Sequence, residues 1–174
     1  LKYVEGENYQ TIDKVKRDII QLYLDDFRKM DPSGKLGRFY LAIPSELSSQ
    51  STRYKITGIT SNGRLKRERE SFYNLEDSQT VQICQHISDP RVGLTTTIDK
   101  DFFKMFTEDT GLFVTLCFYD KQFSENIIYQ KLVSGRLSAN LGYVYENAVA
   151  QALTAIGFKL YYHTFKKEGD VKHS

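Results

Sequence analysis

Apolar residues recur at steps of three and four along the first thirty residues, which is the spacing of one face of an α-helix. Thr11 can cap this helix, because a short hydroxyl side chain accepts from the free N–H groups of the first turn. The run Asp31-Pro32-Ser33-Gly34 then reads as a turn that ends it. The pattern predicts an N-terminal helix with an inward face made of Ile12, Val15, Ile19, Leu22, Tyr23, Phe27 and Met30.

The same spacing returns in the last third of the chain, which reads LSANLGYVYENAVAQALTAIGFKLYYHTF from Leu137 to Phe165. Ser138 or Asn140 can cap this helix, and Gly157 stands where a left-handed C-terminal residue is wanted. Residues 158–165 are rich in strand formers, and 166–170 reads as a turn toward a further strand. We expect a well-packed helix whose buried stripe carries Leu141, Val144, Tyr145, Ala148, Val149, Ala152, Leu153 and Ile156.

Shorter elements fill the middle of the chain. Two short helices separated by Pro44 are expected at 36–42 and 45–47, then a strand at 54–59 and a charged helix at 64–75. Alternating residues predict strands at 80–87 and 102–107, followed by a helix at 111–118. This order suggests a winged-helix-like arrangement over 34–107. The predicted fold class is α+β, divided into a linking helical segment (1–33), a winged-helix-like segment (34–107) and the start of an endonuclease-like α/β core (108–174).

The composition is that of an ordinary globular protein, with 174 residues, 40% hydrophobic, 26% charged and a net charge of +2. No apolar run reaches the roughly 18 residues of a membrane span, and no signal peptide is recognisable. Cys84 and Cys117 lack the spacing of metal ligands, so two buried thiols in a reducing compartment are expected. We therefore expect a cytoplasmic protein without a membrane partner. The first residue is Leu rather than Met, which agrees with a fragment of a larger protein.

Four cations lie together in the predicted charged helix, namely Arg64, Lys66, Arg67 and Arg69. Clustered cations can bind nucleic-acid phosphates, and winged helices often bind DNA. Glu68 and Glu70 are interleaved with them and dilute the positive field. The segment is therefore a candidate nucleic-acid-binding site, but the interleaved acids favour a solvated or protein-docking helix face.

Two further sequences imitate functional motifs. The Gly34-Lys35 pair lacks the earlier glycine and the following hydroxyl of a phosphate-binding P-loop, so no ATP site is expected there. The sequence Asp170-Val171-Lys172 imitates part of a nuclease motif but lies in a predicted turn. The three histidines, His86, His163 and His173, show no metal-ligand or catalytic-triad spacing.

Several segments resemble the C-terminal region of bacterial AAA-type P-loop ATPases. They are LYLDDFRKMDPSGKLGRFYLAIPSELS (22–48), FKMFTEDTGLFVTLCF (103–118), ENIIYQKLVSGRLSANLGYVYENAVAQAL (125–153) and LYYHTF (160–165). The run NLGYVYENAVAQ is the most specific, and the resemblance is weakest over about 61–94. In that family an N-terminal ATPase domain precedes a C-terminal domain of unknown function with a restriction-endonuclease-like core.

The resemblance implies roles for particular residues and partners. Glu146 matches the first-helix acidic position of the nuclease-like core, where a carboxylate helps to hold Mg²⁺. Spacing alone instead favours a solvated residue on the helix flank. The family usually continues with a strand carrying Glu-x-Asp, and this sequence ends before it.

The resemblance therefore implies an accessory domain of an ATPase that recognises DNA or another protein and is not catalytic as a fragment. The alternative is part of a Mg²⁺-dependent nuclease whose remaining ligands lie beyond residue 174. No cofactor is expected in this fragment, since ATP and Mg²⁺ belong to the N-terminal ATPase domain of the parent protein, which is also the first expected partner.

Overall fold

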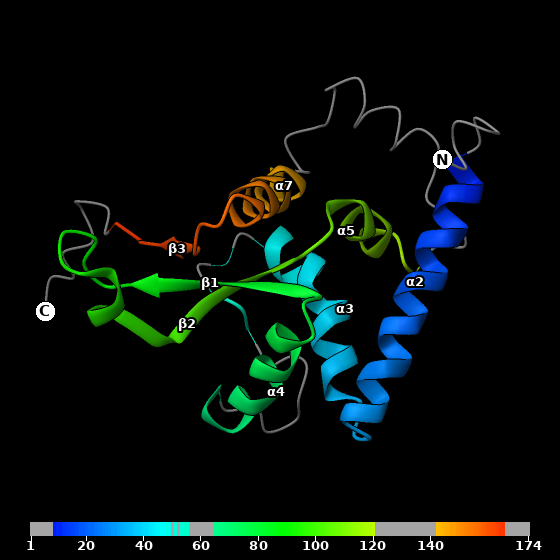
Figure 1. Ribbon diagram of the computed structural model, residues 1–174, viewed down its shortest axis with the longest axis horizontal. Coiled ribbons are helices and arrows are strands. Elements are labelled where there is room, and N and C mark those ends of the chain that lie inside the picture. Colours follow the sequence, from blue (N-terminus) through cyan, green and yellow to red (C-terminus); the bar gives the residue numbers. More distant parts are fainter. Residues whose placement is uncertain (1–8, 50, 52, 56–64, 121–141, 166–174) are drawn as a thin grey trace, which may run out of the picture.

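The computed structural model describes residues 9–49, 51, 53–55, 65–120 and 142–165. It has an α+β fold, as predicted, with five α-helices and three strands in the described part of the chain (Figure 1). In order these are α2 (Tyr9–Met30), α3 (Lys35–Ser48), α4 (Leu65–Asp77), β1 (Val81–Ile87), β2 (Ile98–Thr107), α5 (Thr110–Cys117), α7 (Gly142–Ala155) and β3 (Tyr161–Tyr162), with a 3-10 turn at Leu94–Thr96 between β1 and β2.

The sheet has the strand order β2-β1-β3, with β1 antiparallel to β2 and parallel to β3. Cys84 lies opposite Lys104, and Gln85 lies opposite Phe103. Neighbouring residues of a strand point to opposite faces, so these two pairs mark the two sides of the sheet. In Figure 1, α7 lies on one side of the sheet and α4 on the other, while α3 stands between the sheet and α2.

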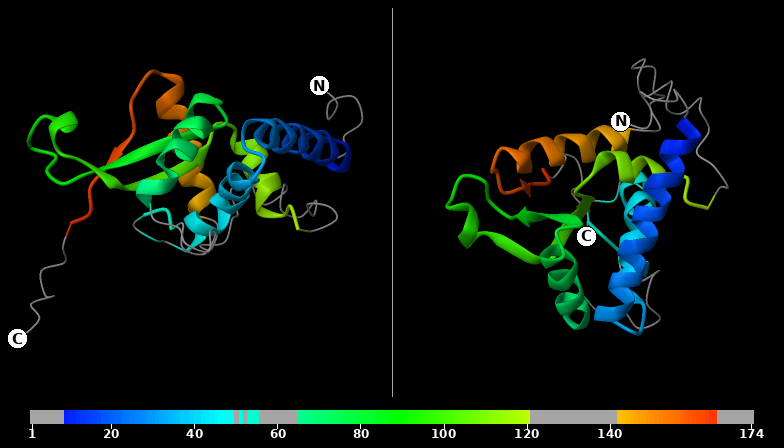
Figure 2. Two further views of the ribbon diagram at one scale, coloured as in Figure 1. Left: turned by 90° about the horizontal axis from the view of Figure 1, so that it is seen from below. Right: turned by 45° about the vertical axis from the view of Figure 1, so that its right-hand side comes forward.

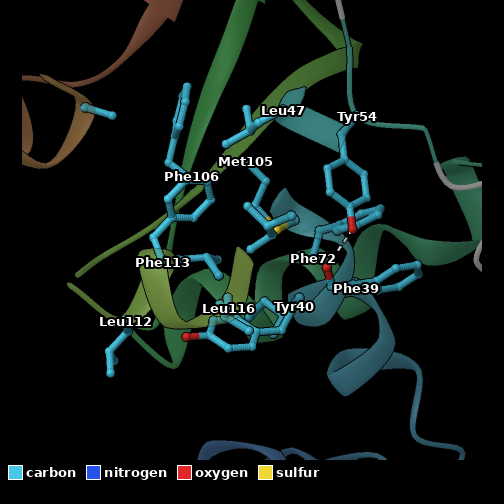
Figure 3. Close-up of a cluster of buried hydrophobic side chains, with 14 of the residues drawn as sticks. Phe39, Tyr40, Leu47, Tyr54, Phe72, Met105, Phe106, Leu112, Phe113 and Leu116 are labelled. Atoms are coloured by element: carbon cyan, nitrogen blue, oxygen red, sulfur yellow. Dashed lines mark hydrogen bonds between the residues drawn. The ribbon is translucent and has the colours of Figure 1, made fainter. Parts of the chain in front are cut away.

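An aromatic cluster holds α3 and α4 against the sheet. The ring of Phe72 lies 4.7 Å from that of Phe39 and 4.8 Å from that of Phe103, measured between centroids. Tyr54 stacks on Phe103, and its hydroxyl donates to the carbonyl of Phe39 at 2.6 Å, so its one polar atom is satisfied inside the core. Figure 3 shows this cluster continuing through Met105 to Phe113 of α5. Such pairs of aromatic rings add to the hydrophobic stabilisation that their burial provides.

The N-terminal helix ends where the sequence predicted, at Met30, but its inward face is different. Ile20, Leu24 and Phe27 are buried, whereas Leu22 is 63% exposed and Met30 50% exposed. The predicted inward placement of Leu22 and Met30 is therefore wrong.

A polar contact fixes how α2 is rotated. Asp13 is fully buried and pairs with Arg17 at 2.7 Å. The Arg17 guanidinium also donates to the carbonyls of Phe118 (2.9 Å) and Tyr119 (3.1 Å), at the end of α5. The last carbonyls of a helix have no partner within the helix, so Arg17 supplies one for α5. This contact turns the Asp13 edge of α2 inward and leaves Leu22 in solvent.

The predicted break at Pro44 is also wrong, because α3 runs through it as one helix. Proline removes one backbone donor from a helix and costs stability there. This loss is offset by a continuous apolar face that extends on both sides of the proline and is buried. It consists of Leu36, Phe39, Tyr40, Ile43 and Leu47. Burial of five large side chains outweighs one lost hydrogen bond.

The middle of the chain follows the predicted order, with α4, β1, β2 and α5 close to their expected places. The expected strand at 54–59 is described only to Lys55, and the Tyr54 N–H donates to the Phe103 carbonyl at 2.7 Å. β3 covers two residues of the eight expected in a strand, and the predicted turn at 166–170 lies outside the described residues. The winged-helix-like arrangement and the proposed domain boundaries stay predictions.

Candidate recognition surface on the last helix

Both apolar and polar side chains attach α7 to the rest of the protein, since Val144 and Ala150 are buried in the core beside a line of polar residues. Asn147 is fully buried, and its Oδ1 accepts from the N–H of Thr107 at 2.9 Å. Its Nδ2 donates to the carbonyl of Thr107 at 3.2 Å and to Oγ1 of Thr110 at 3.1 Å. The amide of Asn147 thus satisfies both backbone groups of Thr107 at the point where β2 ends.

The same polar line continues along α7 at helical spacing. The Oε1 of Gln151 accepts from the N–H of Thr110 at 2.9 Å and from its hydroxyl at 2.7 Å. One turn further, the hydroxyl of Thr154 donates to Gln82 at 3.1 Å. Residues 147, 151 and 154 share one face of a helix, so α7 presents a polar face to β1, β2 and the start of α5. We call these three residues the polar seam.

The opposite side of α7 is apolar and points to solvent. Tyr145 is 49% exposed, Val149 57%, Leu153 38% and Ile156 71%. These four residues are called the outer face of α7, and Figure 2 shows the helix lying at the outside of the molecule. The prediction that they form a buried stripe is wrong, because the buried groups of Thr107 need polar partners and Asn147 supplies them. Only Val144 of the predicted stripe is buried among the residues that the structure describes.

The end of α7 follows the prediction. Gly157 has a φ of +91°, and its N–H and that of Phe158 donate to the carbonyls of Thr154 and Leu153. This is the double hydrogen bond of a glycine-terminated helix. Phe158, which follows this left-handed residue, is largely exposed.

Glu146 lies on the flank of α7 and forms an ion pair with Lys104 of β2. The Lys104 ammonium also lies 5.8 Å from the centre of the Tyr162 ring. The carboxylate that the resemblance places at a Mg²⁺ site is thus neutralised by a lysine of the sheet. Burial raises the pKa of the nearby Cys84 thiol to about 12, with a smaller contribution from Glu146, so this cysteine stays a thiol at neutral pH. In this arrangement the Glu146 carboxylate holds α7 against β2 through its ion pair with Lys104.

A family model described as Domain of unknown function (DUF8612) matches residues 1–123. The chain belongs to the DUF8612 family. No curated protein and no solved structure matches it. The DUF8612 match covers α2 to α5, so α7 and β3 lie outside the matched region. The polar seam therefore joins α7 to the DUF8612 region, chiefly at Thr107 and Thr110.

The four predicted nucleic-acid-binding cations lie at or near the start of α4, within the DUF8612 match. Arg64 and the side chains of Lys66 and Arg67 lie outside the described residues. Arg69 pairs with Asp101 of β2 at 2.8 Å. Glu68 is buried and pairs with Lys35 at 3.2 Å. The described part of this segment therefore holds α4 against α3 and β2 within the DUF8612 region.

The sequence Gly34-Lys35 begins α3, and Gly34 adopts the left-handed conformation with a φ of +71°. The carboxylate of Asp31 accepts from the N–H groups of Lys35 at 2.9 Å and Leu36 at 3.4 Å. The donors that a phosphate could use at this helix start are thus held by a carboxylate of the chain itself.

Two histidines meet at the far end of the sheet. The rings of His86 and His163 stack with centroids 6.0 Å apart, and His163 Nδ1 lies 2.8 Å from the carbonyl of Ile87. Across residues 9–49, 51, 53–55, 65–120 and 142–165, no group of three or more His, Cys, Asp or Glu side chains is placed to hold a metal ion. In these same segments every helix is too short or too polar to cross a lipid bilayer.

The polar seam is the feature that sequence reasoning missed. Asn147, Gln151 and Thr154 recur at steps of four and three, which is a helix periodicity as good as that of the apolar stripe. When a helix has both a regular apolar face and a regular polar face, its sequence does not reveal which of the two is buried. The available signal was the pair of amide side chains one turn apart, but amides are mostly exposed in proteins, so this signal alone does not place them inside.

Proposed function

We propose that this chain is a protein-recognition domain that binds its partner through the outer face of α7. The observation that supports the proposal is the exposure of four large apolar side chains on one face of a helix whose other face is held by hydrogen bonds. Grouped apolar side chains in solvent mark interaction sites more often than single ones do.

The chemistry of the outer face favours a protein over a nucleic acid or a membrane. The only charged residue in α7 is Glu146, and Lys104 neutralises it. Nucleic-acid binding needs cations toward the phosphates, and helices that lie on anionic membranes carry lysine and arginine on their polar face. The polar face of α7 carries amides and hydroxyls instead. The partner that fits is the apolar side of another helix, which can lie along the roughly 21 Å of this 14-residue helix.

The wider setting of this recognition domain comes from the resemblance given above. We propose that it is the C-terminal accessory region of a bacterial AAA-type ATPase, with a winged-helix-like segment before the start of an endonuclease-like core. In this setting the helix that covers α7 belongs either to the ATPase domain of the same protein or to a separate protein. A role as part of a Mg²⁺-dependent nuclease ranks second, because the Glu146 carboxylate would have to exchange its ion pair with Lys104 for a metal ion.

Site-specific photo-crosslinking tests the proposed surface in cells that naturally make the protein. A photo-reactive phenylalanine analogue replaces Val149 or Ile156 on the outer face, or Leu22 on α2 as a control. Leu22 is a matched control because it is an apolar helix residue with a similar exposed fraction. We expect one discrete protein adduct, or one intramolecular crosslink, from positions 149 and 156 and none from position 22.

The identified partner is then purified and titrated with the wild-type chain and with Val149→Asp. Placing a carboxylate at the centre of an apolar contact should weaken binding by about tenfold or more. Crosslinks of equal yield at positions 22, 149 and 156, or an affinity unchanged by Val149→Asp, would show that the outer face is not the binding surface.

A further inference from the structure

A groove lies beside the edge of β1, away from the outer face of α7. Its volume is about 390 Å³, and Glu76 of α4, Glu108 after β2 and the segment that leads into β3 line it. A smaller apolar pocket of about 100 Å³ adjoins it and shares Ile83 and Gln85 as a common wall. Four aromatic side chains line the pocket, Phe72, Tyr73, Phe102 and Phe103. A site of this kind combines a small apolar cavity with a wider polar channel.

The edge of β1 that faces the groove offers backbone hydrogen-bonding groups. β3 pairs with β1 only at Gln85 and His86, and the Gln85 N–H donates to the Leu160 carbonyl at 3.2 Å. Backbone groups of a strand alternate between its two edges, so the N–H and C=O of Ile83 point to the same edge as those of Gln85. At Ile83 this edge has no strand neighbour among the described residues, and Ile83 lines the groove.

The charges that line the groove determine which peptide segment can bind beside β1. The groove holds the carboxylates of Glu76 and Glu108 and one cation, Lys159. Glu108 is oriented by the amide of Gln82, which donates to it at 2.6 Å. Partial burial raises the pKa of Glu76, the neighbouring Asp77 raises it further, and Lys159 lowers it by a smaller amount. A partly buried carboxylate gains from a cationic partner.

We propose that this groove binds an extended peptide segment of a partner protein, which adds a strand to β1 at Ile83 and places a lysine or arginine beside Glu76 and Glu108. Main-chain hydrogen bonds to the sheet edge supply affinity in this mode, and side-chain pockets supply selectivity. The aromatic pocket takes an aliphatic side chain of the same segment. This site is separate from the outer face of α7, so either can exist without the other.

Fluorescence anisotropy with labelled peptides tests the proposal on the full chain at low ionic strength. The probe is acetyl-(Val-Lys)3-amide, which alternates apolar and basic residues as a strand does. One control peptide carries glutamate in place of lysine, and another carries N-methyl groups on alternate residues, which remove main-chain donors. We expect the lysine peptide to bind at least about tenfold tighter than the glutamate peptide and the methylated peptide to lose binding.

The variant Glu76→Gln identifies the groove, with Glu70→Gln as its control. Both residues are exposed on α4, but only Glu76 lines the groove. Glu76→Gln should weaken binding of the lysine peptide by about threefold to fivefold, and Glu70→Gln should leave it unchanged. Equal binding of the glutamate peptide, unchanged binding after methylation, no binding of the lysine peptide, or equal losses in the two variants would each overturn the proposal.

Discussion

Replacement of Asn147 by alanine should destabilise the protein more than any change on the outer face of α7. Asn147 is fully buried, and its amide pairs with both backbone groups of Thr107, which is also fully buried. Alanine keeps the helix but removes every one of these hydrogen bonds. The N–H and the carbonyl of Thr107 are then left in the interior without the amide that satisfied them.

The expected loss of stability follows from the N–H and the carbonyl of Thr107. A buried polar group that loses its partner costs about 1–3 kcal/mol, and two such groups give about 2–6 kcal/mol before relaxation. Some relaxation of α7 lets water reach Thr107, so we expect a loss of about 2–4 kcal/mol in the free energy of unfolding. Val149→Asp should change it by less than about 0.5 kcal/mol, because the side chain already lies in solvent.

Urea titrations followed by far-UV circular dichroism measure both variants, since the chain has no tryptophan to report by fluorescence. The expected order of stability is wild type and Val149→Asp together, with Asn147→Ala well below them. If Val149→Asp lost as much stability as Asn147→Ala, the outer face would be buried in solution and the orientation given for α7 would be wrong.

Three further predictions concern other contacts. Arg17→Ala should lower the free energy of unfolding by about 2–3 kcal/mol in urea melts, because the buried Asp13 and the carbonyls of Phe118 and Tyr119 just after α5 lose the guanidinium as hydrogen-bond donor. A loss under about 1 kcal/mol contradicts this. Gly157→Ala should cost about 1 kcal/mol in the same melts, since alanine is strained at a φ of +91°, and an unchanged midpoint contradicts it. Burial raises the pKa of both Cys84 and Cys117 to about 12, so each ionises in the unfolded chain first and stability should fall as pH rises from about 8.5 toward 12. A thiol reagent at mildly alkaline pH should accordingly label the folded chain far more slowly than the urea-unfolded chain, and equal rates refute this.

Element positions were predictable from the sequence where local chemistry decides them. The turn after Met30, the helix end at Gly157 and the strand β1 each depend on neighbouring residues, and each lies close to its expected place. Glycine adopts the left-handed conformation at a helix end without the steric strain that other residues have there, so this preference needs no tertiary contact. The same reasoning failed at Pro44, where burial of apolar residues on both sides outweighs a local preference.

The orientation of helices was not predictable, because it depends on contacts between distant residues. Leu22 and Val149 both lie on regular apolar stripes, and both point to solvent. In each case a buried polar group decides the rotation of the helix, Asp13 in α2 and Asn147 in α7. Arg17 lies only four residues from Asp13, but its contact with the end of α5 joins residues far apart in the sequence. The pairing of Asn147 with Thr107 at the end of β2 likewise joins distant residues, so neither long-range contact is recognisable from the sequence.

The candidate site shows the same limit. Glu146 was recognisable as a carboxylate on the flank of its helix, but its pairing with Lys104 joins residues 42 positions apart. The β1 groove is lined by residues of α4, of all three strands and of the segment after α7, and no local pattern brings these together.

The most direct test of the recognition surface compares two valines of α7 in solution. Val149 is 57% exposed and Val144 is 5% exposed, although they lie in the same helix. Methyl-labelled protein is titrated with a soluble gadolinium chelate, and the relaxation of each methyl group is measured by NMR. Strong relaxation of the Val149 methyls with little effect on those of Val144 is the predicted result, and the reverse order, or equal effects, would contradict an outward apolar face.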